Sequence, residues 1–245
     1  MKRIKLIVAY DGTKYHGWQI QPGDITVEQI INEKLSQLTG EEIKVIGASR
    51  TDSGVHAMGN VAVFDTESRI PGEKFSYALN QCLPEDIRIQ HSEEVAADFH
   101  PRHCDCRKTY RYQIWNAKFP NPMQRLYAHF ICYELDLVAM RRAAQYLIGE
   151  HDFKSFCSSK TQVADTVRHI YDLKVTQEGD MIAIYVQGNG FLYNMVRIIA
   201  GTLIEVGLHR KQPEDIQAML TALDRQIAGP TAPANGLTLM QIEYL

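Results

Sequence analysis

The segment from Gly47 to Ala57, GASRTDSGVHA, places ionisable side chains of opposite charge among small and polar residues. Arg50 and Asp52 stand two residues apart, and such residues face the same side of an extended backbone. A nearby guanidinium favours the ionised form of a carboxyl group, and an ionised, positioned carboxylate can act as a nucleophile or an electrostatic stabiliser. The alternative is an Asp-Ser-Gly turn with a surface ion pair, which is common in loops. The spacing alone leaves both interpretations open.

The segment from Phe99 to Trp115, FHPRHCDCRKTYRYQIW, interleaves cationic and aromatic side chains. This pattern suits a surface that binds phosphates and stacked bases. Tyr110, Tyr112 and Ile114 also share one face of the strand expected there, so an ordinary sheet core is the competing interpretation. The cationic residues of this segment are Arg102, Arg107, Lys108 and Arg111.

Four possible metal ligands lie in the same segment, namely His100, His103, Cys104 and Cys106. Their spacing matches none of the familiar zinc-binding pairs, and no second Cys/His pair follows nearby. We therefore expect no metal site, and two thiols packed beside a sheet are the simpler account.

The segment from Gly188 to Gly207, GNGFLYNMVRIIAGTLIEVG, follows an expected strand and opens an expected helix. It resembles the start of a dinucleotide-binding motif, but the third glycine is missing. Arg197 is the only charged residue between Gly188 and Ile204, and a cation in so apolar a helix requires a carboxylate partner or a route to water. Asp52 is the candidate partner; extension of Arg197 to the surface is the alternative.

The chain has 245 residues, of which 45% are hydrophobic and 22% charged, as is usual for a globular protein. The net charge of -3 argues against binding nucleic acid over the whole surface, although a local basic region is compatible with it. Five scattered cysteines do not suggest a disulfide framework. The N-terminal MKRIKLIVAYDG is typical of a first strand rather than a signal peptide, and no apolar run has membrane-spanning length. We expect a cytoplasmic protein without a membrane segment.

These segments must be positioned by an α+β fold with largely antiparallel sheets. Alternation predicts a first strand over 3–10, and a capping box from Thr26 to Gln29 opens a helix that stops at Gly40. Both halves follow the order strand-helix-strand-strand-helix-strand, and we expect domains over 1–104 and 105–245. Further strands are predicted over 43–48, 58–65, 87–96, 109–116, 127–133, 168–176, 181–187 and 237–244, and further helices over 73–81, 136–149, 191–206 and from Pro213.

The sequence resembles the tRNA pseudouridine synthase A family, and the resemblance covers nearly the whole chain. The RTDSGVHA part of the first segment is the most specific motif. Pro101 is a small departure, since alanine is commoner there. The other matching stretches are YDGTKYHGWQ (10–19), the run from Phe99 that ends in KTYRY, HDFKSF (151–156), GNGFLYNMVR (188–197) and APANGLTL (232–239).

The resemblance implies the pseudouridine synthase fold and isomerisation of uridine to pseudouridine at positions 38, 39 and 40 of the tRNA anticodon stem-loop. It implies that Asp52 is the catalytic nucleophile and that Tyr110 stacks on the substrate base. Arg50 would hold the displaced nucleotide, and Arg197 would pair with Asp52. The resemblance further implies a homodimer whose two subunits contact one tRNA, and a reaction without a cofactor or a metal.

Two other functional classes compete with this interpretation. A non-catalytic tRNA-binding module would need the basic and aromatic strand but not Asp52. A metal-dependent nucleic-acid hydrolase would use His100, His103 and the neighbouring cysteines, and it would be sensitive to chelators. The family resemblance makes both improbable.

Overall fold

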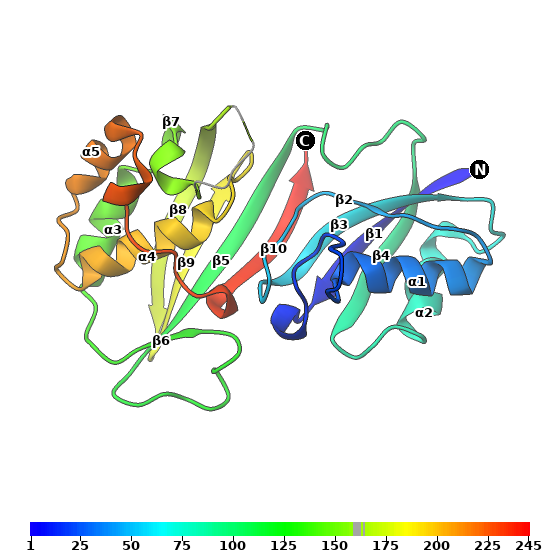
Figure 1. Ribbon diagram of the computed structural model, residues 1–245, viewed down its shortest axis with the longest axis horizontal. Helices are drawn as coiled ribbons and strands as arrows, with labels where there is room; N and C mark the ends of the chain where they lie inside the picture. The colour runs from blue at the N-terminus through cyan, green and yellow to red at the C-terminus, as the bar shows by residue number, and fades with distance from the viewer. Residues whose placement is uncertain (159–162, 164) are drawn as a thin grey trace. The chain divides into compact units, whose positions relative to one another are not determined.

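The computed structural model describes residues 1–158, 163 and 165–245. Its strands and helices form two compact units (Figure 1). The first unit comprises residues 1–105 together with 238–245, and the second comprises residues 106–237. Each unit contains a sheet with helices packed against it.

In the first unit the strands follow the order β4-β1-β3-β10, and β2 pairs with β3. β1 is antiparallel to both β3 and β4, whereas β10 is parallel to β3. The elements are β1 (Lys2–Tyr10), η1 (Gly12–Lys14), α1 (Val27–Thr39), β2 (Ile46–Gly47), β3 (His56–Thr66), η2 (Gly72–Lys74), α2 (Phe75–Asn80), β4 (Ile87–Val95) and β10 (Leu237–Tyr244).

The local sequence explains the first strand and helix of this unit. Every second residue of β1 from Ile4 to Tyr10 is buried, as the alternation predicts. The Thr26 side chain accepts a hydrogen bond from the Gln29 N–H at 3.4 Å, and Gly40 closes α1 with a left-handed φ of 75°. The reciprocal half of the predicted capping box is absent, because the Gln29 side chain donates to Glu33 instead, at 2.8 Å.

In the second unit the strands follow the order β5-β9-β8-β7 with antiparallel pairing, and β6 is parallel to β5. The elements are β5 (Cys106–Asn116), β6 (His129–Ile131), α3 (Leu137–Gln145), β7 (Gly149–Asp152), η3 (Lys154–Phe156), β8 (Val167–Glu178), β9 (Met181–Gly188), α4 (Met195–Gly207), α5 (Asp215–Ala222), η4 (Arg225–Ile227) and η5 (Ala234–Gly236).

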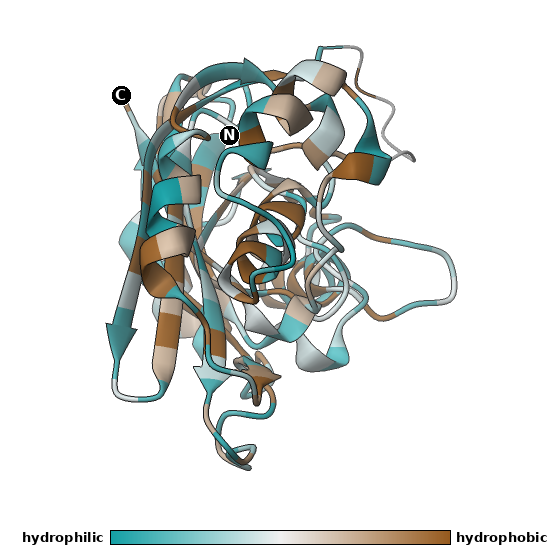
Figure 2. Ribbon diagram, turned by 90° about the vertical axis from the view of Figure 1, so that its left-hand side faces the viewer, coloured by the Kyte–Doolittle hydropathy of each residue, from teal (hydrophilic) through white to brown (hydrophobic). Residues whose placement is uncertain are grey.

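The core of the second unit lies between one face of this sheet and α4. Tyr112 of β5 and Ile184 of β9 are paired across the sheet, and both are completely buried. All but two residues of α4 are buried, the exceptions being Arg197 and Glu205. In the hydropathy colouring of Figure 2, the strands change repeatedly between hydrophobic and hydrophilic along their length. That alternation is typical of sheets that are covered on one face.

The α+β class and the largely antiparallel sheets are confirmed, and the first unit has the predicted element order. In the second half, β6 and α5 correspond to the predicted strand over 127–133 and the predicted helix from Pro213, whereas β7 was not predicted. Several predicted ranges were too long: strand 43–48 shortens to β2, strand 127–133 to β6 and helix 73–81 to α2. The helix from Asp136 ends at Gln145, and the helix over 191–206 begins at Met195. Asn194 has a left-handed φ of 61°, which interrupts any helix that starts before it.

The division into functional halves at residues 104 and 105 stays a prediction, and by its contacts the last strand belongs to the first unit. Among the described residues, no helix combines the length and the apolar character that crossing a membrane requires.

Candidate active site

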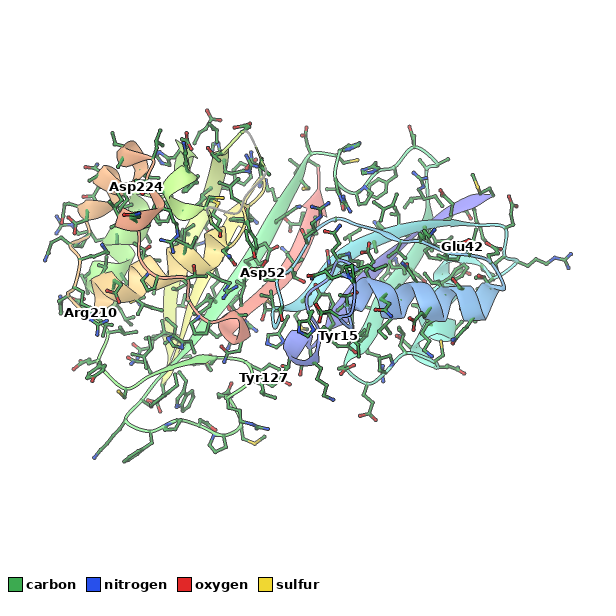
Figure 3. The ribbon with its side chains drawn as sticks, in the orientation of Figure 1. Tyr15, Glu42, Asp52, Tyr127, Arg210 and Asp224 are labelled. Atoms are coloured by element: carbon green, nitrogen blue, oxygen red, sulfur yellow. The ribbon has the colours of Figure 1, made fainter. Side chains whose placement is uncertain are left out.

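Asp52 lies in the loop between β2 and β3, at the first position of a tight turn. The Val55 N–H donates to the Asp52 carbonyl at 3.1 Å, and Gly54 has a φ of 77°, which glycine adopts without strain. The Gly54 N–H and the Ser53 hydroxyl both donate to the Tyr15 carbonyl, at 3.2 and 3.4 Å. Figure 3 labels Asp52 and Tyr15. These bonds fix the backbone that carries the carboxylate.

The segment 10–19, YDGTKYHGWQ, packs directly against this loop. The hydroxyls of Tyr10 and Thr51 are hydrogen bonded at 2.8 Å in a buried position. The backbone N–H of Trp18 donates to the Thr51 carbonyl at 3.1 Å. Gly17 has a φ of 85°, and a Cβ there would lie 2.4 Å from the Thr51 oxygen. Hydrogen bonds and close packing therefore join segment 10–19 to the loop, and the segment supports the backbone next to Asp52.

Two further contacts hold the beginning of the loop. Asn60, buried in β3, donates from its side-chain amide to the Ser49 carbonyl at 3.1 Å. Arg102 donates from Nε to the Gly47 carbonyl at 2.7 Å, across 55 residues of sequence. On its other side Gly47 meets the indole of Trp18, since a Cβ would lie 2.2 Å from Nε1. Sequence reasoning named Arg102 only as one of several cations.

The exposure of the loop alternates from residue to residue. Thr51 is buried, whereas Arg50 is exposed and Asp52 is half-buried. This agrees with the expectation that residues two apart share a side of an extended backbone. Within the described part of the chain, Arg50 forms no ion pair.

In the second unit, Tyr110 lies on the buried face of β5 with an exposed fraction of 7%. Its ring meets the edge of the Phe191 ring, with centroids 5.2 Å apart and planes at 83°. Tyr112 and Ile114 continue the same face and are completely buried. These three side chains therefore form one buried row, and Tyr110 is the member at its more accessible end.

Arg197 lies in the first turn of α4 and is held by two acceptors of the same unit. It donates from Nη1 to the Asn194 side chain at 2.9 Å and from Nε to the Ala232 carbonyl at 2.8 Å. The Ala232 N–H returns a bond to the Arg197 carbonyl at 3.1 Å. The guanidinium is thus fixed in orientation rather than extended freely into solvent. These contacts also join the motifs over 188–197 and 232–239.

Two buried tyrosines, Tyr15 and Tyr112, have raised pKa values, which favour their neutral forms. Burial raises the pKa of Tyr112 well above its ordinary range, and the positive charge of Arg197 offsets part of this rise. Burial also raises the pKa of Tyr15, which the hydrogen bond from its hydroxyl to Asp86 at 2.6 Å increases further. Both hydroxyls act as structural donors, since Tyr112 donates to the Pro233 carbonyl at 3.0 Å.

The possible metal ligands of segment 99–115 do not converge. No group of three or more His, Cys, Asp or Glu side chains suited to a metal occurs among the described residues. The rings of His100 and His103 stack instead, with centroids 3.8 Å apart.

Comparison with known proteins gives the class of this chain. A family model described as tRNA pseudouridine synthase matches residues 6–103 and 143–245. The chain belongs to the tRNA pseudouridine synthase family.

Among its relatives, the tRNA pseudouridine synthase A of Ruminiclostridium cellulolyticum is 51% identical over 245 residues, and that of Caldicellulosiruptor saccharolyticus is 48% identical over 244, each match covering 100% of both chains. A solved archaeal box H/ACA sRNP Nop10-Cbf5 complex matches 83% of this chain and 44% of that chain, with a TM-score of 0.38 and 11% identity.

The family resemblance read from the sequence is therefore confirmed. The structure places Arg50 and Asp52 in the first unit, and Tyr110 and Arg197 in the second. The predicted pairing of Asp52 with Arg197, and the roles of all four residues, stay predictions. Sequence reasoning missed the residues that support them, because their contacts join segments far apart in the chain. The motif composition was the only available signal for these supporting residues, which are Tyr10, Trp18, Asn60, Arg102, Phe191 and Asn194.

Proposed function

We propose that this chain isomerises uridine to pseudouridine in tRNA, at positions 38, 39 and 40 of the anticodon stem-loop. Membership of the tRNA pseudouridine synthase family over the full chain carries the proposal. The family assignment also favours catalysis over a module that only binds tRNA. The hydrogen-bonded support of the Asp52 loop is consistent with a carboxylate that must be held in one place.

The reaction itself sets what the site must supply. The C1′–N1 glycosidic bond breaks, the uracil turns, and a C1′–C5 bond forms; C5 loses its proton and N1 gains one. Atoms and electrons balance within the substrate, so the conversion requires no redox partner. The uracil of a stem is inaccessible while it is stacked, and it must be flipped out to react.

Each predicted site residue has a part in this scheme. Asp52 is the nucleophile, and its half-buried position leaves one side open to a substrate. Tyr110 stacks on the flipped uracil, with Phe191 bracing its ring at 5.2 Å. Arg197 pairs with the Asp52 carboxylate, and the exposed Arg50 holds the displaced nucleotide. An apolar surround retains the detached uracil and keeps water out.

The wider setting is also part of the proposal. The protein acts in the cytoplasm as a homodimer, and both subunits contact one tRNA. Sedimentation of the free protein and of its tRNA complex tests the dimer: a monomeric protein with full activity would contradict it.

The decisive experiment follows tritium released from tRNA labelled at uridine C5. The wild type is compared with Asp52→Asn and with Asp180→Asn, a matched change of an exposed aspartate in the turn between β8 and β9. We expect release by the wild type and Asp180→Asn, and none by Asp52→Asn although it still binds tRNA. Binding without release by the wild type would leave only the tRNA-binding module.

A further inference from the structure

Arg102 contacts the start of the Asp52 loop through one edge of its guanidinium. Its Nε donates to the Gly47 carbonyl at 2.7 Å, in a partly buried bond, although the residue as a whole is exposed. Its own N–H donates to His100 Nδ1 at 3.3 Å, which fixes the backbone of the arginine. One edge of the side chain therefore touches the loop, while the rest reaches the surface.

The outer edge of this guanidinium is available to a ligand. Arginine carries five N–H donors in a planar fork, and only the Nε donor is used by Gly47. Across the described ranges of the chain, the two Nη groups of Arg102 have no protein acceptor. A fork of this kind matches the paired oxygens of a phosphate.

The neighbouring charges favour an anion from outside the protein. Arg3, which lies in the same region, is neutralised by Asp65 at 2.7 Å. Arg102 has no carboxylate partner within the described residues. Burial first, and then the charges of His103 and Arg102, lower the pKa of His100. Arg102 is therefore a cation without an ion-pair partner among the described residues.

We infer that Arg102 binds a backbone phosphate of the tRNA through its Nη groups while its Nε holds Gly47. The inference rests on the proposed function, and it makes Arg102 a positioning residue. Gly47 begins the segment that carries Asp52, and the Trp18 indole confines it on the opposite side. The same side chain therefore links occupancy by tRNA to the placement of the catalytic loop.

A purely structural role is the competing explanation. Arg88 provides the comparison, because its guanidinium donates to backbone carbonyls, including that of Ile87 at 2.7 Å, in β4 of the same unit. An arginine that only caps a carbonyl stabilises the fold without sensing the phosphate charge of a ligand.

The test compares Arg102→Gln, Arg102→Lys and the control Arg88→Gln in the full chain. Two quantities are measured: the Kd for tRNA across a series of salt concentrations, and the single-turnover rate of C5 tritium release at saturating tRNA. We expect Arg102→Gln to weaken binding about tenfold, to reduce the salt slope by about one, and to slow the saturated rate. Arg102→Lys should retain the salt slope because it keeps the charge, yet still react slowly, because an ammonium cannot span both partners.

Arg88→Gln should leave the salt slope unchanged. An unchanged slope in Arg102→Gln would overturn the phosphate contact, whatever happens to its rate. A full saturated rate in Arg102→Lys and Arg102→Gln would overturn the link to the loop. Failure of the proposed function would appear separately, as wild-type binding without tritium release, and the salt slopes would still report on Arg102.

Discussion

The hydroxyls of Tyr10 and Thr51 lie 2.8 Å apart in the interior of the first unit, although 41 residues separate them in sequence. Tyr10 ends β1, and Thr51 immediately precedes Asp52. Their exposed fractions are 4% and 8%, so water cannot readily replace either partner. The bond ties the backbone next to the proposed nucleophile to the sheet.

Tyr10→Phe is therefore expected to lower both stability and activity. Loss of the buried hydrogen bond to Thr51 costs about 1 kcal/mol of unfolding free energy. The freed Thr51 hydroxyl loosens the loop, and the longer bond from the Asn60 side chain at 3.5 Å is lost as well. Urea unfolding and the single-turnover rate measure the two effects. Tyr77→Phe, at a residue that is 70% exposed, is the control and should match the wild type. Equal behaviour of the two variants would show that the Tyr10 bond has no role in positioning.

Gly17 and Gly23 form a matched pair that isolates the packing of the loop. Both have a φ of 85°, so alanine introduces comparable backbone strain at each, about 1–2 kcal/mol. A Cβ at Gly17 would lie 2.4 Å from the Thr51 oxygen, whereas nothing lies within 4 Å of one at Gly23. We expect Gly17→Ala to reduce the rate of tritium release strongly and Gly23→Ala to reduce only stability. Similar rates in both variants would contradict the close packing.

The sequence predicts the structural features that local residue patterns control. It does not predict the contacts between segments that are far apart in the chain. The burial of β1 and the start and stop of α1 follow from alternation, the Thr26 cap and Gly40. The prediction of the second half of the capping box was wrong, because the side chain of Gln29 donates to Glu33 instead, at 2.8 Å. A competition between two local partners is decided by packing, which spacing does not reveal.

The candidate site shows the same division. Residue types alone indicated that Arg197 requires a partner, since an isolated cation in an apolar helix is costly. Two of its acceptors are Asn194, one turn away, and the carbonyl of Ala232, 35 residues further along the chain. Only the first lies within reach of a helical spacing argument. The second depends on the path of the chain after α5, for which the sequence offered no pattern.

Asn194→Gly tests whether the orientation of Arg197 matters for catalysis. Glycine removes the acceptor of the Arg197 Nη1 bond and at the same time relieves the left-handed φ of 61°. Stability should be maintained, while the saturated rate falls about tenfold, as expected for a misdirected charge. Leu223→Gly relieves a similar φ of 55° at the end of α5, and it should leave the rate unchanged. A fast Asn194→Gly enzyme would remove Asn194 from the mechanism.

The raised pKa of Tyr112 leads us to expect that the free energy of unfolding decreases at alkaline pH. Burial raises its pKa in the folded state, whereas in the unfolded chain it ionises with the ordinary value of 10.0. Above about pH 10 the unfolded state therefore binds fewer protons than the folded state, and the free energy of unfolding falls as pH rises. Below that pH the contribution of Tyr112 is fully present.

Tyr112→Phe removes this dependence, together with the hydrogen bond from the hydroxyl to Pro233, which is worth about 1 kcal/mol. The variant should be less stable than the wild type at pH 8, and the difference should shrink as the pH approaches 11, because only the wild type loses the contribution of the raised Tyr112 pKa. The raised pKa of Tyr15 is common to both proteins. Urea unfolding at intervals from pH 8 to pH 11 measures the difference. Parallel curves for the two proteins would mean that the Tyr112 hydroxyl ionises as easily in the folded state as in the unfolded chain.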